Sequence, residues 1–244
     1  MLFGSYYTVL VYRIPNGLKL TKLNSFCVHC NEKLSLIDSI PIISFFISRR
    51  KCKQCNAKIS IKYVLIEVST AAMFVFLYLF HGISFDLFLN LSLSSMLLIT
   101  FIIDLEHMVV SDMVLILFSS YVIVYIIFTE ATFLWHVLGL AVGFLPFLLI
   151  YITVKLIYKR EAFGFGDVTL SASVGWFLGV RYSILTSILS FVIASVCMIF
   201  LKLLNKSFDK KTEIAFGPFI CIAAIISSMF GEKIIDFYFA LTLF

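Results

Sequence analysis

Charged residues are scarce in this sequence: they make up 14 % of its 244 residues, whereas hydrophobic residues make up 61 %. Soluble proteins carry about a quarter charged residues, so the composition excludes an ordinary soluble domain. The sequence also lacks a visible internal repeat, and no basic segment follows Met1, which argues against a cleavable signal peptide. Long runs of Leu, Ile, Val and Phe take up most of the chain and predict an all-α, multi-pass membrane protein surrounded by lipid.

The apolar runs predict about eight transmembrane helices. Each crossing needs about 20 apolar residues. The first run, residues 1–12, is too short to cross unaided, which points to a late start codon, a truncated chain or a helix lodged against its neighbours. The C-terminal residues 234–244 are apolar but too short for a further span. The remaining predicted spans are 64–80, 85–103, 113–128, 133–154, 168–180, 183–201 and 214–230.

One polar, basic segment interrupts these runs and divides the chain into three parts. They are the short first membrane helix at 1–12, a loop at 13–62 and a membrane core at 63–244. Alternation of eight spans puts seventeen of the 19 Lys and Arg on the side of this loop. That asymmetry predicts a cytoplasmic loop in a plasma membrane. Anionic lipid headgroups account for the net charge of +5, so no nucleic-acid partner is needed.

The loop contains two Cys-x-x-Cys pairs, Cys27 with Cys30 and Cys52 with Cys55. This spacing is typical of a four-cysteine structural zinc site. Disulfides are the alternative, but a cytosolic loop lies in a reducing compartment. Four thiolates would close the coordination sphere, which makes a catalytic metal improbable. Cys197 and Cys221 lie inside apolar runs and are interpreted as small core residues.

Carboxylates at the predicted membrane boundary form a second signal, because hydrocarbon disfavours them. Asp104 ends one span, and Phe163-Gly164-Phe165-Gly166-Asp167 opens another on the same side. Two carboxyls together in a partly dry site cannot both ionise cheaply, so one retains a proton while the other acts as a base. Aspartyl proteolysis needs this pair, and glycines would let an extended substrate approach. The alternative is that these acids cap helices or pair with loop cations.

Together these motifs resemble the type IV prepilin peptidase family, membrane aspartic proteases of the GxGD type. The likeness covers nearly the whole chain, and the motifs occur in the family's order and spacing. A lone GxGD would be weak support, whereas the complete set is highly specific. Besides the cysteine pairs and Gly-Phe-Gly-Asp167, the set comprises Tyr12-Arg13-Ile14-Pro15, Asp38-Ser-Ile-Pro41-Ile-Ile-Ser44, Tyr63 with Glu67, Asp104 with Asp112, and Phe216-Gly217-Pro218-Phe219.

The resemblance implies an enzyme that removes the leader peptide from type IV prepilins or from pseudopilins of secretion and competence systems. Cleavage would occur at the cytoplasmic face of a bacterial plasma membrane. Asp104 and Asp167 align with the family's two catalytic aspartates, and Gly164, Gly166 and Asp112 are expected to shape the site.

Many members of the family also methylate the new N-terminal amine with S-adenosylmethionine. Glu67 is a candidate cofactor-binding residue for that step, with an ion pair to Lys62 or another loop cation as an equal alternative. The segment Arg50-Lys51 before Cys52 lacks the glycine that the family often has in a region linked to methyl transfer. Methylation is therefore less strongly implied than cleavage.

Other departures from the family pattern leave the two aspartates untouched. Thr8 replaces an asparagine of the first helix, and Ser111 and Val64 replace prolines. Two alternatives remain: a leader peptidase without methyltransferase activity, and a non-enzymatic carrier or scaffold with a zinc loop. Carriers usually place ionisable groups near the bilayer midplane between repeats, whereas both acids here are predicted at one interface.

Overall fold

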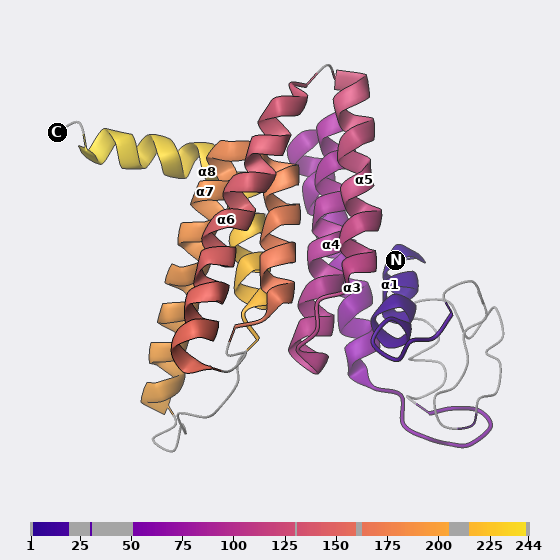
Figure 1. The fold of residues 1–244 in the computed structure, drawn as a ribbon. Coiled ribbons are helices and arrows are strands. Elements are labelled where there is room, and N and C mark those ends of the chain that lie inside the picture. The colour runs from indigo at the N-terminus through magenta and orange to yellow at the C-terminus, as the bar shows by residue number, and fades with distance from the viewer. Residues whose placement is uncertain are drawn as a thin grey trace. The chain divides into compact units, whose positions relative to one another are not determined.

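The computed structural model describes residues 2–19, 30, 51–129, 131–159, 163–204 and 215–242. Its regular structure is helical throughout, and no strand occurs among the described residues, which confirms the predicted all-α class. Figure 1 shows these helices in chain order. They are α1 Leu2–Arg13, α3 Ile61–His81, α4 Phe85–His107, α5 Asp112–Thr129, α6 Phe133–Tyr158, α7 Phe165–Leu204 and α8 Gly217–Thr242.

The chain forms two compact units. Unit 1 comprises Met1–Ile83 and contains α1 packed against α3, whereas unit 2 comprises Ser84–Phe244 and contains α4 to α8. Within unit 2, α7 packs along α6 and against α8, while α4 contacts both α5 and α8. Unit 2 therefore has a core of its own, in which Met96, Leu97 and Ile99 are completely buried.

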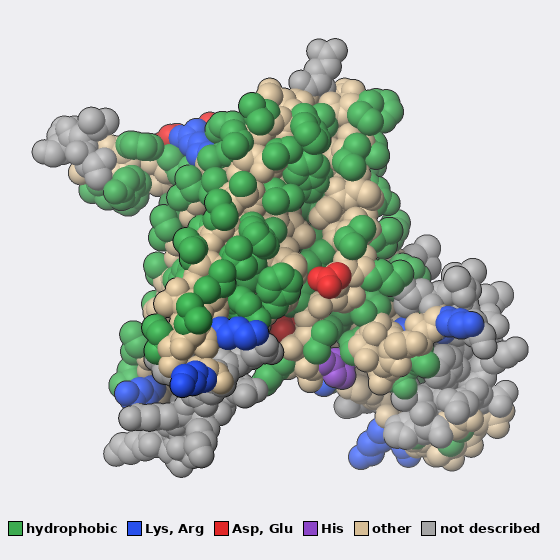
Figure 2. Space-filling model, in the orientation of Figure 1, with side chains coloured by type: hydrophobic (Ala, Val, Ile, Leu, Met, Phe, Trp, Pro, Cys, Tyr) green, Lys and Arg blue, Asp and Glu red, His purple; other side chains and the backbone are tan. Residues whose placement is uncertain are grey.

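Six of the described helices, α3 to α8, are long and apolar enough to cross a membrane. Figure 2 shows hydrophobic side chains covering much of the visible face of unit 2. In water such a surface would be strongly unfavourable, whereas lipid solvates it without cost. The chain is thus a multi-pass membrane protein. The twelve residues of α1 are too few to cross, as expected from the sequence.

Helix α7 is two helices joined at Gly179. This glycine has φ 71° and ψ −176°, values outside the helical region that favour glycine. Gly143 of α6 faces Ser171 and Ser183 together: an added Cβ would collide with the Ser171 carbonyl oxygen and lie 3.1 Å from Ser183 Oγ. In one straight helix these serines would be about 18 Å apart. The chain therefore reverses at Gly179, at the end of the predicted span 168–180 and before the predicted span 183–201, while the total of eight spans stays a prediction.

Small residues let α6 and the two halves of α7 approach closely. A Cβ on Gly139 would collide with the Gly175 carbonyl oxygen, and a Cβ on Gly175 would collide with that of Gly139. Without a hydrophobic force between helices in lipid, such close backbone packing is a principal source of helix association. This packing holds the start of α7, where Asp167 lies, against α6.

Helix α8 extends beyond the predicted span 214–230 and ends at Thr242. The apolar run is interrupted by Gly231, Glu232 and Lys233, but these residues do not break a helix as proline would. Gly231 also provides room for Tyr182, since an added Cβ would lie 2.5 Å from its ring. The residues after the predicted span therefore continue the same helix.

Candidate active site and cysteine cluster

Asp104 lies in the last turn of α4 and is only 4 % exposed. The helix ends one turn later at Met108, which takes a left-handed conformation and donates its N–H to the Asp104 carbonyl oxygen at 2.9 Å. One carboxyl oxygen, Asp104 Oδ2, is buried and has no hydrogen-bond partner among the described residues. A buried polar atom of this kind is costly unless function requires it.

Asp167 lies in the first turn of α7 and is 7 % exposed. Its backbone N–H donates to the Gly164 carbonyl oxygen at 3.2 Å, which closes the turn that begins the helix. A Cβ on Gly164 would lie only 3.2 Å from Asp167 Oδ2. Glycine at position 164 therefore lets the backbone pass directly over the carboxyl group. An acid here also complements the helix dipole, so capping and catalysis are compatible roles.

Gly217, the first residue of α8, brings the two carboxyl groups together. A Cβ built on it would collide with Asp104 Oδ2 and would lie 3.4 Å from Asp167 Oδ1. The Gly217 backbone also hydrogen-bonds to both carboxyl groups, and that of Gly164 hydrogen-bonds to Asp167. Two acids that are 63 residues apart in sequence thus meet at one glycine.

A cluster of phenylalanines packs next to Gly164 and Gly217 and holds their backbone in place. Phe163 precedes Gly164, Phe216 precedes Gly217, and their ring centroids are 5.5 Å apart. Phe191 lies 5.1 Å from the Phe216 ring, and the completely buried Phe147 lies within 6.2 Å of the other three rings. Aromatic pairs at such distances are individually worth about 1 kcal/mol beyond their buried area. We call these four residues the aromatic clamp.

The loop between α4 and α5 contacts the start of α7. A Cβ on Gly166 would lie 2.8 Å from the Cβ of Val110, so any larger residue would push this loop away. Thr169 Oγ1 lies 3.4 Å from Asp112 Oδ1 and 3.0 Å from the Gly166 carbonyl oxygen. Asp112 is exposed and begins α5. It lies beside the pair rather than within it, while Gly166 contacts the loop and not the carboxyls.

Sequence reasoning did not place Gly217, the aromatic clamp or Cys221 in the site. Cys221 is 1 % exposed, as expected of a core residue, yet it lies one turn after Gly217 and interacts electrostatically with both carboxyl groups. The available signal was the dipeptide Phe-Gly, which occurs before Asp167 and again at the start of α8. Glu106 is exposed on the same turn as Asp104, as is His107.

Glu67 is in unit 1, on α3, and is 8 % exposed. Gly4 of α1 packs on its backbone: a Cβ there would lie 2.8 Å from Glu67 Cα. Glu67 is the only carboxylate among the described residues of this unit. It is thus held where α1 and α3 meet.

Three of the four expected metal ligands form a cluster in unit 1. The Sγ atoms of Cys30, Cys52 and Cys55 all lie within 4.8 Å of one another, and those of Cys30 and Cys52 are 4.0 Å apart. None of the three forms a disulfide. Cys27 lies outside the described residues. Tetrahedral coordination with Zn–S bonds of about 2.3 Å needs sulfurs about 3.7 Å apart, so these thiols are close enough to bind a metal ion.

The turn that carries two of these thiols is ordered by its backbone. The Cys52 N–H donates to the Ala57 carbonyl oxygen at 2.9 Å, and the Asn56 N–H donates to that of Cys52 at 3.0 Å. Asn56 has a φ of 55°, in the left-handed region that asparagine tolerates. The turn thereby folds Cys55 back toward Cys52.

Comparison with known proteins gives one consistent result. Residues 1–81 match the family described as the bacterial peptidase A24 N-terminal domain, and residues 91–199 match the type IV leader peptidase family. Three curated relatives are each named prepilin leader peptidase/N-methyltransferase. The one from Bacillus subtilis (strain 168) is 29 % identical and the match covers 100 % of this chain and 96 % of the relative. The one from Pseudomonas putida is 27 % identical, with 96 % of this chain and 89 % of the relative covered, and the one from Legionella pneumophila is 29 % identical, with 96 % of this chain and 90 % of the relative covered. No solved structure matches the chain.

The two family matches together cover most of the chain, and they contain Asp104, Asp167 and all four loop cysteines. The relatives match over nearly their full lengths. The chain therefore belongs to the type IV prepilin peptidase family and is a membrane enzyme of the prepilin leader peptidase class.

Proposed function

We propose that the chain hydrolyses the leader peptide of type IV prepilins or pseudopilins by an aspartyl mechanism, with Asp104 and Asp167 as the catalytic pair. The observation that carries this proposal is the approach of two buried carboxyl groups to one another at Gly217. No salt bridge joins either acid to a residue in the described part of the chain. Burying a carboxyl group in a membrane protein costs free energy, so such residues are candidates for a functional role.

The chemistry needs one carboxylate and one carboxylic acid. The carboxylate takes a proton from a water molecule while the water oxygen attacks the scissile carbonyl carbon. The carboxylic acid donates a hydrogen bond to the carbonyl oxygen, which becomes negatively charged in the transition state. Collapse of the tetrahedral intermediate breaks the C–N bond, and the amine leaves with a proton from the pair. Because the acids titrate as a coupled pair, the roles belong to the pair and not to one residue.

The surrounding residues would support this chemistry in specific ways. The Gly217 backbone hydrogen-bonds to both carboxyl groups and would hold them next to each other. The unpartnered Asp104 Oδ2 retains hydrogen-bonding capacity for the reacting water or the carbonyl. The clamp and Cys221 form an apolar wall that excludes other water, which strengthens electrostatic interactions at the pair.

We propose that this end of unit 2 faces the cytoplasm. Lys155 and Lys159 at the end of α6 and Lys202 at the end of α7 are at the end that carries Asp167, while Arg181 and Lys233 are near the opposite end, after Gly179 and late in α8. The positive-inside rule favours the end with more cations. The leader of a prepilin would then be cut on the cytoplasmic side, next to its apolar segment.

We also propose that unit 1 binds zinc and contributes to N-methylation of the product. Cys30, Cys52 and Cys55 fit zinc by their chemistry and proximity, with Cys27 as the expected fourth ligand. Bound zinc would cross-link the loop and stabilise its fold. Methyl transfer is supported by the names of the relatives. It would move the methyl group from the sulfur of S-adenosylmethionine to the new N-terminal nitrogen, which would lose a proton, and S-adenosylhomocysteine would be released. Glu67 is the candidate residue for the cofactor.

The decisive experiment is leader removal from a co-expressed prepilin by wild type, Asp104→Asn and Asp167→Asn. Asparagine keeps the shape of aspartate but cannot exchange its proton, so each variant should lose at least about 1,000-fold in rate. Glu106→Gln is the matched control, because it removes an exposed carboxylate from the same turn of α4. Near-normal cleavage by either aspartate variant, at equal abundance in the membrane, would overturn the aspartyl mechanism.

The mass of the mature N-terminus tests methylation separately. Wild type should add one methyl group, and Glu67→Gln should leave the cleaved product unmethylated. An unmodified product from wild type would establish a leader peptidase without methyltransferase activity.

A further inference from the structure

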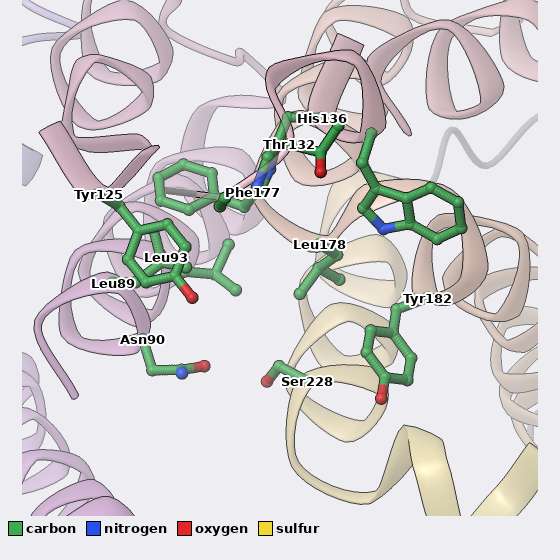
Figure 3. Close-up of a pocket in the computed structure, with 12 residues that line it drawn as sticks. Leu89, Asn90, Leu93, Tyr125, Thr132, His136, Phe177, Leu178, Tyr182 and Ser228 are labelled. Carbon is green, nitrogen blue, oxygen red and sulfur yellow. The ribbon is translucent and has the colours of Figure 1, made fainter. Parts of the chain in front are cut away.

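A cavity lies in unit 2, far from the aspartate pair. It has a volume of about 370 Å³ and is lined by residues of α4, α5, α6, α7 and α8. Asn90 in its wall and Asp104 are on the same helix, about 21 Å apart along the axis. Figure 3 shows Asn90 of α4 and Ser228 of α8 pointing toward one another across the opening, with Tyr125 and Tyr182 on either side. Ligand sites of proteins have volumes of this order.

The cavity wall offers hydrogen-bond acceptors. The His136 Nδ1 is 2.9 Å from the Trp176 carbonyl oxygen, and since a carbonyl only accepts, this nitrogen carries the proton and Nε2 is an acceptor in the neutral ring. Tyr125 donates its hydroxyl hydrogen to Asp86 Oδ1 at 2.9 Å, and Ser228 donates to the Ile225 carbonyl oxygen at 2.9 Å. Asn90 uses its NH₂ group on the Asp86 carbonyl oxygen. Asn90, His136 and Ser228 therefore each retain a free acceptor atom.

The same wall also offers donors. The hydroxyl groups of Thr132 and Tyr182 and the indole N–H of Trp135 make no hydrogen bond to any residue in the described part of the chain. None of the described residues that line the cavity is Asp, Glu, Lys or Arg. The cavity thus combines donors and acceptors without a formal charge.

This combination selects a chemical class. A phosphate or carboxylate ligand needs donors and a positive charge, and an ammonium ligand needs acceptors or a negative charge. A hydroxyl group both donates and accepts and carries no charge, so several hydroxyls on one ligand match the mixed wall. The rings of Tyr125, Trp135 and Tyr182 provide flat apolar faces for the C–H surface of such a ligand.

The cavity adjoins surface that fits acyl chains. Phe85 and Phe128, at the adjoining ends of α4 and α5, stack at 5.7 Å and are 53 % and 63 % exposed. Phe133 and Leu134 at the start of α6, next to Thr132, are also exposed. In a membrane these side chains face lipid.

We propose that this cavity binds a neutral, hydroxyl-rich headgroup, such as the sugar of a glycolipid. The headgroup enters among Asn90, Tyr125, His136, Tyr182 and Ser228, and its acyl chains lie on the phenylalanine surface outside. Hydroxyl chemistry can also come from a free sugar. The two sources share their contacts in the cavity and differ in the contribution of the acyl chains.

Native mass spectrometry of the purified full-length protein tests this proposal. The probes are monoglucosyl-diacylglycerol, phosphatidic acid with the same acyl chains, and free glucose. We expect wild type to retain the glucolipid about tenfold more strongly than phosphatidic acid, since the cavity has no cation for a phosphate. Free glucose that displaces the glucolipid at micromolar concentration would assign the site to free sugar, and its failure to do so would assign it to the lipid.

Three variants sharpen this test. Tyr182→Phe and Ser228→Ala each remove one hydroxyl with little change of shape, and each should weaken glucolipid retention about fivefold. Thr153→Val is the control, because it removes an exposed hydroxyl of α6 that bonds only to the Leu149 carbonyl oxygen. Equal retention of phosphatidic acid and glucolipid by wild type would overturn the proposal, as would unchanged retention in both cavity variants.

Discussion

The cysteine cluster of unit 1 and the aspartate pair of unit 2 are built in opposite ways. Two of the three described thiols come from one turn, Cys52 to Cys55, whose backbone hydrogen bonds bring them together. The carboxyls instead come from the end of α4 and the start of α7, and they meet only because α8 begins between them at Gly217. One site depends on a local turn, and the other on the packing of three helices.

The difference has an energetic cause. Thiolates near a metal gain bond energy from the ion, so a small polar segment can be ordered by the site itself. Two buried carboxyl groups repel each other when both are ionised, so the surrounding packing must hold them together. Unit 2 supplies that packing through the aromatic clamp and the glycine contacts of α6 and α7.

Gly217→Ala should have the largest effect on the assembled site, apart from substitution of the aspartates. The added methyl group would collide with Asp104 Oδ2 and approach Asp167 Oδ1. A displacement of about 1 Å at reacting groups can cost about 100-fold in rate, and we expect a loss of that order in prepilin cleavage. Gly164→Ala, whose Cβ would lie 3.2 Å from Asp167 Oδ2, should lose less. Equal activity of Gly217→Ala and wild type would show that the carboxyls need not meet at this glycine.

Phe216→Ala should have an intermediate effect, because it opens the aromatic clamp without touching the carboxyls. Loss of a packed phenylalanine costs about 3–5 kcal/mol of stability, and Gly217 would lose its anchor. We expect kcat to fall about tenfold with a smaller change in KM, and Phe216→Leu to restore much of the rate. Thermal unfolding of both variants should be recorded beside the rates. If the rate falls only in proportion to the amount of folded protein, Phe216 has a purely structural role.

Cys52→Ser should have the smallest effect on cleavage and a large effect on unit 1. The buried Cys52 contributes one thiol to the cluster, and its loss should release bound metal, measured by elemental analysis of purified protein. Cleavage should stay within about threefold of wild type if the two sites are independent. Ser69→Ala on α3 is a control outside the cluster. Complete loss of cleavage in Cys52→Ser would mean that the loop forms part of the peptidase site.

Much of the architecture could be predicted because membranes impose simple rules. Apolar runs of membrane length correctly located each long helix, and the reversal in α7 at Gly179 falls at the end of the predicted span 168–180. The predicted span 214–230 covers only the first part of α8, because charges at 232 and 233 end an apolar run without ending the helix. The sequence predicted Asp104 and Asp167 at one membrane boundary, whereas the close approach of their carboxyl groups was known only from the structure.

The sequence by itself determined the elements and the chemistry available to them: long apolar helices, paired Cys-x-x-Cys motifs and two acids where hydrocarbon disfavours them. Only the tertiary structure decided that Gly217 and the aromatic clamp, distant in sequence, complete the aspartate site, and that five helix segments enclose an uncharged polar cavity at the other end. Local sequence patterns indicate which segments lie in lipid and where the chain turns. Contacts between helices distant in sequence depend instead on which side chains fit together when the helices pack.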